Sequence, residues 1–148
     1  MSDDDFVTAF ESCTLSHAEF HHADHVRLGF LYLRRFSAVE AMRRFSEGLR
    51  AFASDNGKPE RYHETITWAF LLLIHERLAR SLLATGAYPE WESFAAANPD
   101  LLNWKDSVLK HYYSEATLAS ELARKTFVFP DRTRETAFHH GGTQSTEG

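Results

Sequence analysis

Three histidines and one glutamate are the residues of this chain whose types and spacing could do chemistry. His22 and His25 are three residues apart, and His63 is followed directly by Glu64. Side chains three apart on a helix have Cβ atoms about 5 to 6 Å from each other, so His22 and His25 could hold one metal ion. A third imidazole from His63 would complete a three-histidine site that keeps positions open for water or substrate, as catalytic zinc and iron sites do.

Glu64 is the residue that could move a proton at such a site. On a helix it projects about 100° away from His63, where it could act as a general base on a bound water or orient a histidine. The pattern therefore predicts a small metal-dependent enzyme of hydrolytic or oxygen-using type. A divalent Zn, Fe, Ni or Mn ion would be the cofactor, and a small molecule would be the substrate. Three further residues are expected to surround the ion or to contact the substrate: His21, Tyr62 and Thr67.

Two interpretations without catalysis stand beside the enzyme. The chain could be a binding protein that holds a metal or a small ligand in the same pocket. It could also be a helical interaction module whose histidines only satisfy one another, since a buried neutral imidazole needs a donor and an acceptor. A zinc protease is excluded, because the string that begins at His63 and Glu64 has Thr67 where the HExxH motif requires its second histidine.

Two stretches with helical periodicity, 16–36 and 59–83, must position these side chains. In the first stretch, His22 and His25 share one stripe with Gly29, and in the second His63 shares a stripe with apolar residues. All three histidines are therefore expected in the middle of apolar helical faces. Gly29 costs about 1 kcal/mol of helix propensity relative to Ala, and its missing side chain would let a second helix approach. We expect the two histidine helices to touch there.

The remaining signals are also helical. Ser37 and Glu40 form a capping-box pattern, Gly57 and Gly86 follow the ends of periodic stretches, and Ser114 precedes a last apolar run. A helix is also predicted from residue 99 to about residue 113. We predict an all-α, single-domain bundle of about five helices around a buried central helix. The domain is expected to span 1–130 and to be followed by a flexible polar tail over 131–148.

Composition bounds the class of protein. A chain of 148 residues can bury a core without disulfides or a structural metal. The single Cys13 cannot form an internal disulfide, and the start does not resemble a signal peptide, so a cytoplasmic location is expected. The longest uncharged run, 65–74, has about half of the roughly 20 residues of a membrane span. No membrane partner is expected, and the oligomeric state is left open.

The charge balance argues against nucleic acid as a partner. The net charge is −5, whereas phosphate binding requires a basic surface. One group of cations is nevertheless close in sequence, and its interleaved Glu40 and Glu47 favour a solvated, ion-paired face. A docking site for an anionic ligand is the alternative. The group consists of Arg34, Arg35, Arg43, Arg44 and Arg50.

Two segments of the chain carry a resemblance. Residues 20–26 match the pattern F-x-H-x-x-H-V, and residues 62–67 match Y-H-E-T-x-T. With these motifs the chain from Phe20 to Asp131 resembles an uncharacterised family of small bacterial all-helical proteins. The resemblance favours His22 over His21 and implies a site that includes His25, His63, Glu64 and Thr67. It implies no activity and no cofactor.

Overall fold

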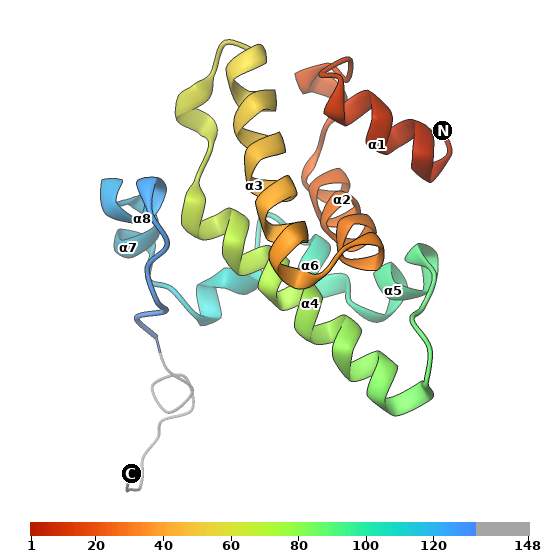
Figure 1. Cartoon of the computed structure of the whole chain (residues 1–148). Coiled ribbons are helices and arrows are strands. Elements are labelled where there is room, and N and C mark those ends of the chain that lie inside the picture. The colour runs from red at the N-terminus through yellow and green to blue at the C-terminus, as the bar shows by residue number, and fades with distance from the viewer. Residues whose placement is uncertain (133–148) are drawn as a thin grey trace, which may run out of the picture.

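The structure is a computed structural model that describes residues 1–132, and every regular element in that range is helical (Figure 1). The prediction of an all-α bundle is confirmed. In chain order the α-helices and 3-10 helices (η) are α1 (Asp3–Glu11), η1 (His17–Glu19), α2 (His22–Arg35), α3 (Ala38–Asp55), η2 (Pro59–Arg61), α4 (Glu64–Thr85), α5 (Trp91–Ala97), α6 (Pro99–Leu102), η3 (Val108–His111), α7 (Glu115–Ala119) and α8 (Glu121–Lys125).

Helix α4 lies at the centre, with α2 and α3 on one side of it and α8 beside its first turns (Figure 1). Its buried side chains come from most of its circumference, as expected for the central helix of a bundle. The predicted approach at Gly29 is confirmed. A Cβ atom built there would lie 3.1 Å from methyl carbons of Ile74 and Leu71, so only a glycine lets α2 and α4 pack this closely without displacing them.

The predicted helix over 16–36 is wrong in its first third. The chain forms one 3-10 turn, η1, then extends through Phe20 and His21 before α2 begins at His22. The carboxylate of Asp24 accepts a hydrogen bond from the backbone N–H of His21 at 3.0 Å. This bond satisfies one of the backbone donors that a helix start leaves free and fixes the start of α2 here. His22 is therefore the first residue of a helix and not the middle of one.

The predicted helix over 59–83 also begins later than expected. Pro59–Arg61 is a separate 3-10 turn, η2, and α4 starts at Glu64. His63 is the N-cap residue, and its Nδ1 atom accepts a hydrogen bond from the backbone N–H of Ile66 at 3.1 Å. The imidazole replaces the Ser, Thr, Asp or Asn that usually occupies this position. The ends at Gly57 and Gly86 are as predicted, since both have left-handed backbones with φ of 74° and 79°.

The last third of the described chain is more broken than predicted. The helix expected from residue 99 to about residue 113 is wrong: α6 stops at Leu102, and a loop and η3 follow. The helix expected from Ser114 is interrupted at Ser120, which caps α8. Three side-chain hydrogen bonds fix this region: two attach it to α4 and one lies within it. Thr65 on α4 binds both Thr126 and Val128, and Tyr113 donates to the Val128 carbonyl oxygen at 2.8 Å.

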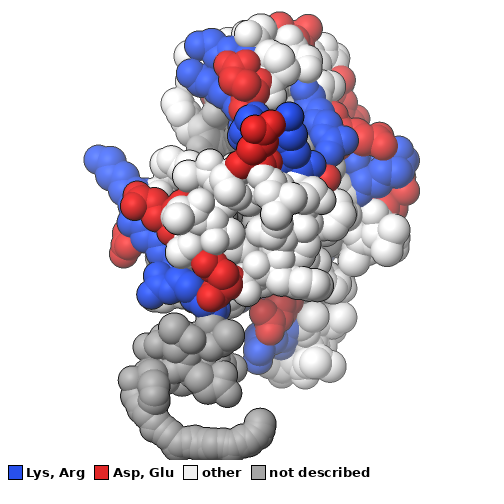
Figure 2. Space-filling model, turned by 90° about the vertical axis from the view of Figure 1, so that its left-hand side faces the viewer, with Lys and Arg blue, Asp and Glu red and all other residues white. Residues whose placement is uncertain are grey.

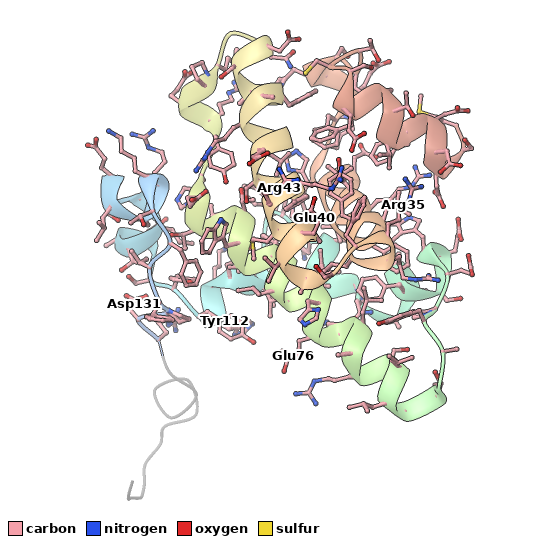
Figure 3. All side chains as sticks on the ribbon, viewed as in Figure 1. Arg35, Glu40, Arg43, Glu76, Tyr112 and Asp131 are labelled. Carbon is pink, nitrogen blue, oxygen red and sulfur yellow. The ribbon has the colours of Figure 1, made fainter. Side chains whose placement is uncertain are left out.

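The packed domain extends at least to Arg132. Asp131, labelled in Figure 3, accepts hydrogen bonds from Ser114 and Thr117, and these bonds lower the pKa of its carboxyl to about 2. The backbone N–H of Arg132 donates to the Tyr112 carbonyl oxygen at 3.0 Å. The first two residues of the predicted tail are thus bound to the domain, and the rest of it lies outside the described residues.

The five arginines predicted to lie close together each donate to an oxygen of this chain. Figure 3 shows Glu40 and Arg43 together on α3, where their side chains approach to 2.6 Å. Figure 2 shows positive and negative side chains mixed in small groups around a broad uncharged area on one side of the molecule. This arrangement matches the solvated, ion-paired face. The partners are Pro89 O for Arg34, Asp4 for Arg35, Glu40 and Glu47 for Arg43, Glu40 for Arg44, and Glu64 for Arg50.

None of the helices within residues 1–132 combines the length and the hydrophobicity that crossing a membrane requires.

Candidate functional site

A cavity of about 480 Å³ lies between α2, α3, η2 and the first turns of α4, and it brings the three predicted histidines together. Its volume falls within the range of small-molecule sites, roughly 300 to 1,000 Å³. Half of the lining side chains are apolar and half are polar, and no Asp or Glu is among them. The lining residues are His17, His22, His25, Val26, Phe45, Leu49, Phe52, Ala53, Asn56, Lys58, Arg61, Tyr62, His63, Ile66, Thr67, Phe70, Ile74 and Trp104.

His22 is held at the cavity wall by one hydrogen bond. Its Nε2 atom lies 2.9 Å from the carbonyl oxygen of Leu101, and because a carbonyl only accepts, Nε2 carries the proton. Its ring packs against those of Phe70 and Trp104, at centroid distances of 4.9 and 5.0 Å. Burial lowers the pKa of His22, so the ring is neutral at pH 7. Its Nδ1 atom then keeps a free lone pair that can accept a hydrogen bond.

His25 lies one turn further along α2 and stacks on Phe20 with ring centroids 4.2 Å apart. Its ring makes no hydrogen bond with any side chain or backbone group of residues 1–132. Burial, and then the neighbouring imidazoles of His22 and His17, lower the pKa of His25 to about 4. A neutral imidazole with unused donor and acceptor atoms therefore faces the cavity, where a bound molecule could satisfy it.

His63 uses both of its ring nitrogens inside the protein. Nδ1 accepts from the Ile66 N–H as the cap of α4, and Nε2 lies 2.8 Å from the carbonyl oxygen of Leu118 on α7. The tautomer is thereby fixed with the proton on Nε2. His63 joins the start of α4 to the C-terminal helices and has no ring nitrogen left for a ligand in the cavity. Thr67, one turn later, also lines the cavity, and its hydroxyl has no partner within residues 1–132.

Glu64 does not line the cavity. Its carboxylate accepts hydrogen bonds from the phenol of Tyr62 and from Arg50, the latter at 3.0 Å. Burial and the contact with Glu64 raise the pKa of Tyr62 to about 12. Tyr62 lines the cavity, as predicted for a residue near the ligand, whereas Glu64 does not. His21 is exposed and does not line the cavity either.

The three histidines share a cavity without forming the ligand set of a metal ion. Within residues 1–132, no group of three or more His, Cys, Asp or Glu side chains is arranged to hold a metal. His63 has no lone pair to offer, because Nδ1 is occupied by the helix cap. Only His22 and His25 have a nitrogen lone pair to spare here, and two ligands are fewer than structural or catalytic zinc sites use.

Four lining residues with exposed side chains were not among the site residues predicted from the sequence: His17, Lys58, Arg61 and Trp104. All four are exposed and therefore mark the rim of the cavity. An Arg61 guanidinium nitrogen hydrogen bonds to the Nε2 atom of His17, which links η2 to η1 across that rim. The sequence held one signal for the two cations. They lie on either side of Pro59, which begins a 3-10 turn between the two long helices α3 and α4.

Comparisons with known proteins found no protein-family model, curated protein or solved structure that matches the chain.

Proposed function

We propose that this protein binds a small organic molecule in the cavity between α2, α3 and α4, without catalysis. The observation that carries the proposal is a cavity of ligand size whose wall includes polar ring and hydroxyl atoms that have no hydrogen-bond partner within residues 1–132. These atoms belong to His22, His25 and Thr67. All three side chains line the cavity, where a bound ligand could donate hydrogen bonds to them or accept hydrogen bonds from them.

The composition of the wall supports a binding site. Phe45, Phe70, Ile74 and Val26 are almost fully buried and form an apolar surface. Ligand sites in proteins combine such a surface with a few polar groups that fix the orientation of the ligand. The rings of His22, Phe70 and Trp104 pack against one another edge to face or tilted and add aromatic surface to the wall.

The metal-dependent enzyme predicted from the histidine pattern is the second candidate. His22 and His25 are three residues apart in the first turn of α2, and both line the cavity. Such an enzyme would need His63 to release Ile66 from the cap of α4, and Glu64 to leave Arg50 and Tyr62. The binding protein requires neither change, and we therefore favour it.

Calorimetric titration with decan-1-ol, a neutral amphipathic probe, tests the proposal in the tag-free full chain. Binding with 1:1 stoichiometry is expected, together with a rise in the thermal unfolding temperature. Ala53→Phe would fill the cavity from α3 and is expected to abolish binding. Ala53→Leu, which adds less volume, is expected to weaken binding by an intermediate factor and serves if the Phe variant does not fold.

Ala51→Phe is the matched control, because Ala51 lies on the same helix, is exposed and does not line the cavity. It should bind decan-1-ol as the unchanged protein does. Equal binding by the Ala51 and Ala53 variants, or no binding by the unchanged protein, would refute the proposal. Metal analysis of the same preparation tests the second candidate. Stoichiometric Zn, Fe, Ni or Mn that is lost on His22→Ala would favour the enzyme.

A further inference from the structure

Resting on the proposed function, we propose that the ligand is an organic anion whose apolar body fills the buried end of the cavity. A carboxylate or a similar acidic head would then lie at the rim, at Lys58 and Arg61. Three features of the molecule favour such a ligand: the charge of the lining residues, the pairing of cations elsewhere in the chain, and the difference in burial between the two parts of the wall.

The cavity is a positive region in an acidic protein. The whole chain carries a net charge of −5, yet the cavity wall contains Lys58 and Arg61 and no Asp or Glu. Since a site of one sign concentrates ligands of the opposite sign, an anion is favoured over a neutral molecule or a cation. A cationic ligand would meet two like charges and no carboxylate.

Lys58 and Arg61 also differ from most cations of this chain. Seven arginines form salt bridges to Asp or Glu side chains within residues 1–132: Arg27, Arg35, Arg43, Arg44, Arg50, Arg77 and Arg80. In that same range Lys58 and Arg61 form none, and the one side-chain bond between them and the protein joins Arg61 to the neutral acceptor Nε2 of His17. Arg61 keeps further N–H groups that could bind an acidic oxygen.

The burial of the lining residues indicates how the ligand is oriented in the cavity. Lys58, Arg61 and His17 are exposed, whereas Phe45 and Ile74 are 2% and 0% exposed. A charged head is most stable where water and cations remain, and an apolar body where water is excluded. His25 is polar but neutral at pH 7. It therefore offers a hydrogen bond to the ligand without adding a charge to the wall. The geometry therefore favours an amphipathic anion over a compact one such as inorganic phosphate.

Three probes with the same ten-carbon chain test the head group by calorimetry: decanoate, decan-1-ol and decyltrimethylammonium. Decanoate is expected to bind about tenfold or more tightly than decan-1-ol, because charge-assisted hydrogen bonds are the stronger class. Decyltrimethylammonium is expected to bind most weakly. The advantage of decanoate should shrink as salt is raised, since the cations are at the exposed rim.

A double variant, Lys58→Gln with Arg61→Gln, should reduce the affinity for decanoate to that for decan-1-ol in the same variant, so the decanoate preference is lost whatever the small change in decan-1-ol binding. The matched control is Arg80→Gln with Lys125→Gln, which removes two positive charges from exposed pairs that do not line the cavity. That control should keep the preference for decanoate.

The outcomes separate this inference from the proposed function. Equal affinity for decanoate and decan-1-ol would contradict an anionic ligand. A preference for decanoate that survives in the Lys58 and Arg61 variant would contradict the position of the acidic head at these two residues. Both results would leave the proposed binding cavity unchallenged. Tightest binding of decyltrimethylammonium would likewise contradict an anionic ligand and leave the cavity unchallenged. If none of the three probes binds, both the proposed binding function and the anionic ligand are contradicted, because the apolar chain that the probes share does not bind to the cavity.

Discussion

The Nε2 atom of His63 lies 2.8 Å from the carbonyl oxygen of Leu118, a residue 55 positions later in the chain. The other nitrogen of the same ring caps α4 through the N–H of Ile66. One imidazole thus fixes where the central helix starts and where the C-terminal helices attach to it. This relationship makes His63 a structural residue at the edge of the cavity.

Replacement of His63 should therefore cost stability. In His63→Ala, the loss of the helix cap and of the bond to Leu118 should lower the free energy of unfolding by about 2 kcal/mol. In His63→Asn the amide can still cap α4, so about half of that loss is expected. Urea unfolding measures both. Equal losses in the two variants would show that the cap is not what His63 contributes.

The same residue shows how far the sequence could predict the site. Helical periodicity placed His22 and His25 on one face of α2, because the period of side chains around a helix is a local property. His63 lines the same cavity as the cap of α4 and not from the helical face that was predicted. The periodicity could not locate the helix starts, since His is not among the residues that usually cap helices. Asp24, three residues after His21, was the one local sign that α2 begins late.

The rim of the cavity could not be predicted for a different reason. His17 and Arg61 are far apart in sequence and meet only through the packing of η1 against η2. No periodic pattern relates residues on two separate 3-10 turns. In contrast, the approach of α2 to α4 was predicted from Gly29. A glycine in the middle of a helix lowers helix stability, and close packing against a second helix is a reason for it to be there.

His25 should make the stability of the fold depend on pH. Folding lowers its pKa from 6.5 to about 4. Between pH 6.5 and pH 4, His25 is therefore protonated in the unfolded chain and neutral in the folded chain. The free energy of unfolding should be unaffected by His25 above pH 6.5 and should fall as the pH drops toward 4. Complete titration of this one shift corresponds to a loss of about 3 kcal/mol.

Urea unfolding at pH 7 and at pH 4.5 measures this loss in the unchanged protein and in His25→Leu. The variant should lose less stability between pH 7 and pH 4.5, because it lacks the imidazole that is protonated only in the unfolded chain. His75→Leu is the control, since His75 is exposed on α4 and should leave the pH dependence as it was. An identical pH dependence in all three proteins would contradict a buried, neutral His25.

Glu64 should matter for stability and not for the contents of the cavity. Its carboxylate binds Tyr62 and Arg50, and its position in the first turn of α4 favours a negative charge. Glu64→Gln keeps the shape and loses the charge, so a decrease of about 1 kcal/mol in the free energy of unfolding is expected. Calorimetry should show unchanged decanoate binding. A strong loss of decanoate binding in a folded variant would contradict this prediction and show that Glu64 contributes to the binding site.

Thr65 and Thr67 provide a matched pair of substitutions, because both are buried threonines of α4 that differ in what their hydroxyls bind. The Thr65 hydroxyl donates to the Thr126 carbonyl oxygen at 2.7 Å and accepts from the Val128 N–H at 3.1 Å. Thr65→Val would leave both of these backbone groups without their partner. A decrease of about 2 kcal/mol in the free energy of unfolding is expected.

Thr67→Val removes a hydroxyl that lines the cavity and has no partner within residues 1–132. The free energy of unfolding should change by no more than about 0.5 kcal/mol, because the shape is kept and no internal hydrogen bond is lost. A ligand that uses this hydroxyl would instead bind more weakly to the variant. Urea unfolding and decanoate titration of the two variants therefore distinguish the threonine that attaches the C-terminal segment from the one that faces the ligand. Equal destabilisation by both would contradict that division.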